Sequence, residues 1–90
     1  MIYKIIYAQK AENDLTRLLK EEPTAYKKAL KLIAELYDHP RTGTSHPEQL
    51  KGRPNQWSRH ITKKHRLVYE INDNEVIVLV LTAYGHYNDK

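Results

Sequence analysis

The spacing of apolar residues changes near the middle of the chain, and this change limits the folds that the sequence can adopt. Between residues 8 and 38 the apolar side chains recur every three or four positions, which is typical of amphipathic helices. From residue 48 onward they alternate with polar residues or form short apolar runs, which is typical of strands. The segment between them, residues 39–47, has no apolar residue and is predicted to be a loop.

The helical part of the chain is predicted to form two helices. Ala11, Leu15, Leu18 and Leu19 give the segment 8–22 one apolar face. Pro23 suits the first turn of a second helix, because a missing N–H costs nothing there. This helix is expected to end by residue 38 and to bury the apolar face formed by Tyr26, Ala29, Leu30, Ile33, Leu36 and Tyr37.

The remaining apolar segments predict five strands in all. The first covers residues 2–7, and the other four, each joined to the next by a short turn, cover residues 48–51, 57–62, 65–72 and 75–83. The last of them is apolar on both faces and is expected to be central. The sequence therefore predicts an α+β fold: an N-terminal strand, two helices and a four-stranded antiparallel meander in one sheet. Ninety residues suit a single domain, residues 1–90.

Several classes of protein are excluded by what the sequence lacks. It contains no cysteine, which excludes disulfide frameworks and thiolate metal sites. Its longest apolar run covers residues 76–81, far short of the roughly 20 residues that cross a bilayer. The histidine spacings match no common metal site, so neither a metal nor another cofactor is expected. These observations favour a soluble cytoplasmic protein with no membrane association.

Basic residues are concentrated in the second half of the chain. Residues 39–69 contain seven basic residues and a single acid, Glu48, for a net charge of +6, whereas the whole chain has +4. This block predicts a polyanionic partner, either nucleic acid or an acidic protein segment, although a solvated basic surface would have the same composition. Lys63 and Lys64 belong to the block. Trp57 lies beside basic residues, where it can stack on a base or belong to the core.

Three residues supply the groups needed for cleavage of RNA without a metal ion. A carboxylate (Glu48) can remove the 2′-OH proton, an imidazole (His86) can protonate the leaving oxygen, and a guanidinium (Arg66) can stabilise the phosphate. Residues of these types occur in most basic domains, so a plain nucleic-acid-binding module remains an alternative. With two-residue turns at 63–64 and 73–74, Arg66 would lie opposite Ile61 and Leu81, on the same face as Arg59. His86 could then meet Arg66 only if the chain broke register near residue 85, where the sequence has glycine.

Four motifs, taken in order, resemble the Txe/YoeB family of bacterial toxins, which are endoribonucleases of the RelE/ParE superfamily. The motifs are PEQLK at 47–51, WSRHIT at 57–62, HRLVY at 65–69 and HY at 86–87. The resemblance covers essentially the whole chain and implies an mRNA interferase that cleaves messenger RNA in the ribosomal A site. It further implies a neutralising YefM-like antitoxin, no cofactor, and a possible homodimer.

The resemblance also implies roles for individual residues. It makes Glu48 the general base, His86 the general acid, Arg66 the phosphate-binding cation, Tyr87 a further active-site residue, and Lys51 and Arg59 contacts to RNA. The sequence departs from the family pattern at His60, where a basic residue is common, at Gly85, and in the extra residues 88–90. The alternative within the superfamily is a ParE-like inhibitor that binds gyrase and needs neither Glu48 nor His86.

Overall fold

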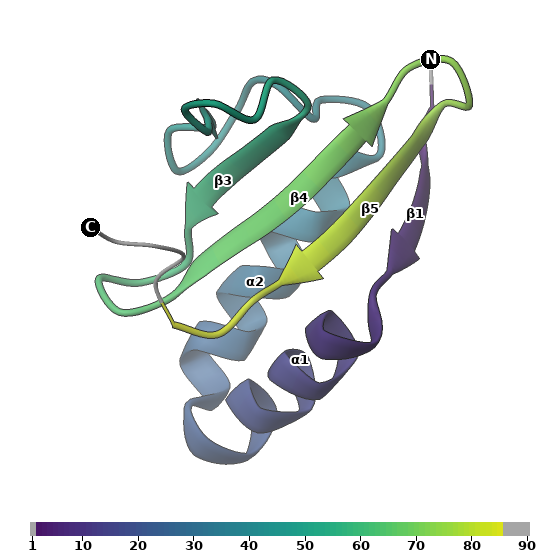
Figure 1. Ribbon diagram of the computed structural model, residues 1–90. Helices are drawn as coiled ribbons and strands as arrows, with labels where there is room; N and C mark the ends of the chain where they lie inside the picture. Colours follow the sequence, from purple (N-terminus) through teal and green to yellow (C-terminus); the bar gives the residue numbers. More distant parts are fainter. Residues whose placement is uncertain (1, 86–90) are drawn as a thin grey trace.

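The computed structural model describes residues 2–85, which form two helices on one face of a five-stranded sheet (Figure 1). The elements follow in the order β1 (Lys4–Tyr7), α1 (Gln9–Glu21), α2 (Pro23–Leu36), β2 (Glu48–Gln49), β3 (Gln56–His60), β4 (Arg66–Asn72) and β5 (Ile77–Thr82). The strand order is β1-β5-β4-β3-β2, with β1 parallel to β5 and the other neighbours antiparallel. The predicted α+β fold with its antiparallel meander is confirmed. β5 is an interior strand with a neighbour on each side, although β4 is the middle strand of the sheet.

The two helices form an antiparallel hairpin with a single residue between them. Glu22 connects α1 to α2 in a non-helical conformation, with φ −143° and ψ 72°. Pro23 opens α2, where its lack of an N–H does no harm. The predicted start of α2 is therefore confirmed, and α2 ends at Leu36, three residues before His39, which the following Pro40 disfavours in a helix.

The core lies between the helices and the sheet, and its helical side differs in part from the prediction. Leu30 and Tyr37, expected to be buried, are both 43% exposed, and Leu19 is 51% exposed. Ala25 and Leu32 are buried instead. These exposed residues lie at the edges of the apolar stripe of each helix, while the residues at its centre face the sheet.

The loops that connect β3 to β4 and β4 to β5 are longer than the predicted two-residue turns. The β3–β4 loop covers residues 61–65, because the backbone N–H groups of Ile61 and Thr62 both donate to the carbonyl of His65. The β4–β5 turn covers residues 73–76 and places Val76 at φ +56°. The prediction that Arg66 lies opposite Ile61 is therefore wrong by one position.

Arg66 in fact pairs with His60, and this shift reverses the face on which its side chain lies. Arg59 pairs with Leu67 and belongs to the opposite face, so the expected common face of Arg59 and Arg66 is wrong. A register shift between Val68 and Tyr69 leaves Leu81 without a direct partner, which also overturns the predicted pairing of Arg66 with Leu81.

Two broad exclusions apply to residues 2–85. The described helices include none long and apolar enough to cross a membrane. No group of three or more metal-ligating side chains is found in this part of the chain.

Candidate functional site

The face of the sheet turned away from the helices carries the candidate site, and we call it the outer face. Residues directly opposite each other in antiparallel strands share a face. Glu48 pairs with Ser58, Ser58 with Val68, and Val68 with Thr82, so these four form one row across β2, β3, β4 and β5. The helices pack against the other face, where Tyr69 belongs to the core.

Arg66 and His60 form the neighbouring pair on the outer face. Along each strand they lie two residues away from the Ser58–Val68 pair, and therefore on the same face. With strands about 4.8 Å apart and residues about 3.4 Å apart along each strand, the Cα atoms of Glu48 and Arg66 are about 12 Å apart. Their long side chains therefore approach a group placed between them from two sides.

The guanidinium of Arg66 has unused hydrogen-bonding capacity. Its Nε atom is shielded from solvent and has no hydrogen-bond partner among the described residues. A buried donor without an acceptor costs about 1–3 kcal/mol, so such a group is typical of a site whose acceptor arrives with a ligand. A phosphate oxygen would satisfy it, because guanidinium groups bind phosphate through charge-assisted hydrogen bonds.

Glu48 is exposed on a strand of only two residues. Within residues 2–85 no ion pair to Glu48 is found, and its carboxylate is exposed. The turn that follows β2 forms a shallow groove of about 390 Å³ lined by residues 49–54, among them the exposed Lys51. The predicted base and one predicted RNA-binding lysine therefore lie on adjoining segments.

The β3–β4 loop brings two further predicted RNA-binding residues to the surface. Lys63 and Lys64 are both exposed in this loop, directly before His65 and Arg66. The ammonium group of Lys64 lies 3.4 Å from the carboxylate of Glu22, and its side chain remains 71% exposed. Both lysines therefore lie at the surface, in the loop that leads to Arg66.

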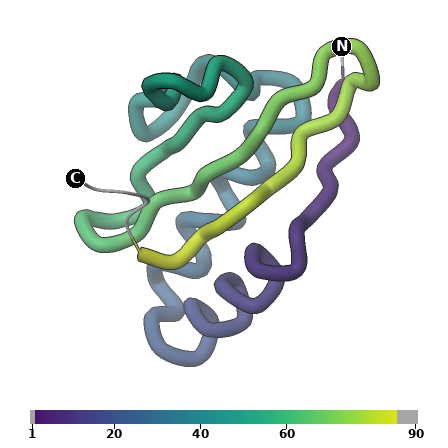
Figure 2. The backbone as a smooth tube through the Cα atoms, viewed as in Figure 1, coloured from purple at the N-terminus to yellow at the C-terminus, as the bar shows by residue number. Residues whose placement is uncertain are grey.

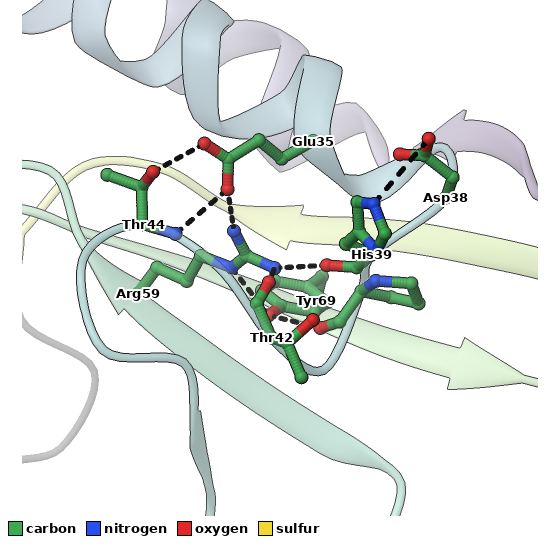
Figure 3. Close-up of polar contacts among 8 residues, drawn as sticks. Glu35, Asp38, His39, Thr42, Thr44, Arg59 and Tyr69 are labelled. Atoms are coloured by element: carbon green, nitrogen blue, oxygen red, sulfur yellow. Dashed lines mark hydrogen bonds and ion pairs between the residues drawn. The ribbon is translucent and has the colours of Figure 1, made fainter.

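Arg59 has a different environment from the one predicted. Its side chain is fully buried on the helix side of β3 (Figure 3). Its Nε donates to the hydroxyl of Tyr69 at 3.0 Å, and Nη1 contacts the Glu35 carboxylate at 2.8 Å. Nη2 donates to the carbonyls of His39 at 2.6 Å and Thr42 at 2.8 Å. The structure therefore does not bring Arg59 to the outer face, and groups within the protein accept most of its hydrogen bonds.

The Arg59 contacts fix the loop that leads to Glu48. Glu35 also accepts hydrogen bonds from the hydroxyl and backbone N–H of Thr44, and these bonds, with a smaller effect of Arg59, lower the pKa of its carboxyl group. Tyr69 donates to the carbonyl of Pro40 at 2.7 Å, and burial raises the pKa of its phenol. The end of α2, the loop after it and two strands are thereby joined around one guanidinium.

Trp57 also lies on the helix side of the sheet. It pairs with Tyr69 and packs, half-buried, against the core. The structure therefore does not bring Trp57 together with Glu48 and Arg66 on the outer face, and of the two roles considered from the sequence it supports the core role.

The chain leaves β5 after Thr82 and is held beside Arg66 at Gly85. The backbone N–H of Arg66 donates to the carbonyl of Gly85 at 3.0 Å, and the N–H of Gly85 donates to Nδ1 of His65 at 2.8 Å. Gly85 has φ +82°, a conformation that glycine adopts readily. The backbone departs from a regular strand at Gly85 as predicted, but β5 already ends at Thr82 and the register shift of its ladder with β4 lies at Leu81, earlier than expected. His86 and Tyr87 lie outside the described residues.

Two acidic residues of α1 hold the preceding residues. The buried carboxylate of Asp14 accepts the backbone N–H of Ala83 at 3.0 Å, and Glu21 accepts the hydroxyl of Tyr84 at 2.8 Å. Figure 2 shows the segment after β5 turning toward the β3–β4 loop. Sequence reasoning did not find these contacts. The available signal was Asp14, which falls between Ala11 and Leu18 on the apolar face of α1.

Comparisons with known proteins agree with this architecture. A family model described as "YoeB-like toxin of bacterial type II toxin-antitoxin system" matches residues 7–87. Toxin RelK of Mycobacterium tuberculosis is 39% identical over 77 residues, which cover 84% of this chain and 87% of that protein. Toxin YoeB of Escherichia coli K12 is 32% identical over 76 residues, covering 83% of this chain and 90% of that protein.

Solved structures of similar proteins have the same fold. A YoeB/ParE toxin from Agrobacterium tumefaciens superposes with a TM-score of 0.86 at 28% identity, covering 93% of this chain and 99% of that one. A YoeB dimer from Staphylococcus aureus gives 0.82 at 25% identity, covering 97% of this chain and 100% of that one. The YoeB-YefM complex from the same organism gives 0.77 at 26% identity, with the same coverage of 97% and 100%.

Proposed function

Since the chain belongs to the YoeB-like toxins of bacterial type II toxin-antitoxin systems, we propose that it is an endoribonuclease that cleaves messenger RNA in the ribosomal A site without a metal ion. The observation that carries the proposal is the shared outer face of Glu48 and Arg66, with a shielded Arg66 Nε that has no partner among the described residues. This arrangement suits a phosphodiester held between a base and a cation.

The proposed reaction is a transesterification in which Glu48 acts as the general base. Its carboxylate takes the proton of the ribose 2′-OH, and the 2′-oxygen attacks the phosphorus atom. The bond between phosphorus and the 5′-oxygen then breaks, and that oxygen takes a proton from the general acid, for which we propose His86. The products are a 2′,3′-cyclic phosphate and a 5′-hydroxyl end, and the cyclic phosphate can hydrolyse to a 3′-phosphate.

Arg66 is proposed to stabilise the negative charge that builds up on the phosphate during attack. A cation already fixed on a strand needs no reorganisation at the moment of reaction, which makes its stabilisation of the transition state effective. The contacts of Gly85 with Arg66 and His65 support the proposed placement of His86 and Tyr87, because these residues directly follow Gly85 in the sequence.

The exposed lysines are proposed to bind the RNA backbone of the mRNA or of the ribosome. Lys51 adjoins Glu48 through the β2–β3 turn, while Lys63 and Lys64 adjoin Arg66 through the β3–β4 loop. Positive charge at both ends of the outer face would orient a strand along it, and binding of this kind weakens as salt concentration rises.

We also propose two protein partners on the basis of similar structures. The YoeB-YefM complex of S. aureus supports a YefM-like antitoxin, whose acidic segment would neutralise the basic block at residues 39–69. The YoeB dimer of the same organism supports a homodimer. A YefM-like antitoxin added before the mRNA is expected to abolish cleavage.

Primer extension on an mRNA in a purified translation reaction tests the proposed function. We expect new 5′ ends at A-site codons with the wild-type protein, and none with His86→Ala or when ribosomes are omitted. The upstream fragments should end in a cyclic or 3′-phosphate, since attack by the 2′-oxygen leaves no 3′-hydroxyl. Intact mRNA under active translation would contradict the proposal, and inhibition of gyrase would then be the next assay.

A further inference from the structure

His65 is a buried histidine whose two ring nitrogens are both engaged. The residue is 1% exposed, in the loop between β3 and β4. Its Nδ1 accepts the backbone N–H of Gly85 at 2.8 Å, and its Nε2 lies 2.7 Å from Oε2 of Glu22. A backbone N–H can only donate, so Nδ1 must be unprotonated and the ring proton must sit on Nε2. The geometry therefore fixes a neutral imidazole that donates to Glu22.

The groups around His65 include several charges and one aromatic ring. The Tyr84 ring packs at 4.3 Å between centroids, and the guanidinium of Arg17 lies 4.0 Å from the centre of that ring. Glu21 binds the Tyr84 hydroxyl, and the ammonium group of Lys64 approaches Glu22 at 3.4 Å. The carboxylate of Glu22 is the charged group in direct contact with the imidazole.

Gly85 is held on both sides by two consecutive residues. The side chain of His65 accepts a hydrogen bond from the Gly85 N–H, and the backbone N–H of Arg66 donates to the Gly85 carbonyl at 3.0 Å. Because residues 65 and 66 are adjacent in the chain, these two bonds fix the position of Gly85 relative to the backbone of Arg66. The next residue in the sequence is His86, the proposed general acid.

We propose that His65 is a positioning residue: its unprotonated Nδ1 holds Gly85 beside the backbone of Arg66 and thereby orients the chain that leads to the proposed general acid. Loss of this acceptor releases Gly85 and lowers the cleavage rate. This inference rests on the proposed endoribonuclease function.

Glu22 fixes the tautomer of His65. Its hydrogen bond with His65 is the largest of the effects that lower the pKa of the Glu22 carboxyl group, so the carboxylate is a good acceptor for the proton on Nε2. Nδ1 is thereby left without a proton, as the hydrogen bond from the Gly85 N–H requires.

Two substitutions separate the two contacts of the ring. In His65→Asn the amide oxygen can take the place of Nδ1, which keeps an acceptor for Gly85 that does not titrate. In His65→Gln the amide reaches the position of Nε2, which keeps the contact with Glu22 and leaves the Gly85 N–H without its acceptor. The two variants thus test which contact matters, at similar side-chain volume.

Hydrogen exchange of the Gly85 amide, measured by NMR, reports on the hydrogen bond between Gly85 and His65 in the absence of RNA. We expect the Gly85 amide to be protected, relative to an unstructured chain, in the wild-type protein and in His65→Asn, and its protection to fall at least tenfold in His65→Gln. Equal protection of Gly85 in the wild-type protein and in His65→Gln would overturn the proposal.

Cleavage kinetics then test the consequence for the reaction. A general acid displaced by about 1 Å can lose about 10²-fold in rate, so His65→Gln should lower kcat by that order and leave KM unchanged. His65→Asn should retain most of the cleavage, because it keeps an acceptor for the Gly85 N–H. Equal kcat values of the wild-type protein and His65→Gln would overturn the proposal. If neither the wild-type protein nor the variants cleave RNA, the proposed endoribonuclease function is wrong. The exchange data still decide in that case whether His65 holds Gly85.

Discussion

Removal of the Arg59 guanidinium should destabilise the fold far more than removal of any exposed arginine. In Arg59→Met the side chain keeps similar length but loses the contacts with Tyr69, Glu35 and the carbonyls of the loop after α2. The side chain of Glu35 is 31% exposed and can regain water, so the main cost is the two carbonyls left without a donor. Loss of one partner of a buried ion pair costs about 3–5 kcal/mol, and the partial exposure of Glu35 places this case near 3 kcal/mol.

A loss of that size is large beside the stability of a small domain, which is about 5–15 kcal/mol. It corresponds to a fall in Tm of about 12–24 °C for a chain of this length. Circular dichroism during urea and thermal unfolding of the purified variant measures both quantities.

The matched control is Arg41→Met, because Arg41 also pairs with a carboxylate, at 2.7 Å from Asp73, but on the surface. Exposed pairs of this kind contribute less than about 1 kcal/mol, so this variant should unfold close to the wild-type protein. If Arg59→Met were as stable as Arg41→Met, the reasoning about the buried guanidinium would be refuted, and a role of Arg59 in binding RNA would need to be reconsidered.

Two further results are expected from the charges at the surface. Hydrogen bonds from Arg41, and to a smaller extent from Tyr3, lower the pKa of Asp73 from its ordinary 3.8. The ionised Asp73 therefore stabilises the fold above pH 3.8, and this stabilisation is lost as the pH falls through the lowered pKa. Asp73→Asn should accordingly flatten the acid limb of a plot of Tm against pH. Unchanged acid sensitivity in that variant would show that the Arg41–Asp73 pair does not matter. Lys51→Ala should weaken RNA binding and lower the slope of log affinity against log salt concentration by about one. A slope equal to that of the wild-type protein would mean that Lys51 does not contact phosphate.

The order and type of the helices and strands were predictable because apolar residues recur at a regular spacing in each segment. Pro23 and Pro40 marked the start of one helix and the limit of its end, and the apolar run of β5 indicated an interior strand. These signals are local in the sequence, and the structure retains them.

The register of β4 was not predictable from the same signals. The hydroxyl of Thr62 accepts hydrogen bonds from the N–H groups of Lys64 and His65, and these bonds enlarge a turn that Lys63 and Lys64 alone would fill. A change of one residue moved Arg66 to the face of Glu48. The hydrogen bonds to the Thr62 hydroxyl therefore help to set the face on which Arg66 lies. The alternation of apolar and polar residues along the strands does not reveal them.

The role of Arg59 could have been inferred in part. Alternation along β3 places it on the same face as Trp57, and a buried arginine requires a carboxylate partner. The sequence does not say which carboxylate it is, because Glu35 lies 24 residues earlier and on a helix. Long-range pairing of this kind appears only when the packing of α2 on the sheet is known.

The most direct test of the account is the cleavage rate of Glu48→Gln on translating ribosomes, compared with Glu75→Gln as a matched control. Glu75 is likewise exposed, but it lies in the β4–β5 turn, away from the row that contains Glu48. Loss of a general base lowers rates by about 10²–10⁴-fold, and we predict a loss in this range for Glu48→Gln with the Tm unchanged. Glu75→Gln should cleave at the wild-type rate. Equal cleavage by the two variants would contradict the assignment of the outer face as the site of RNA cleavage.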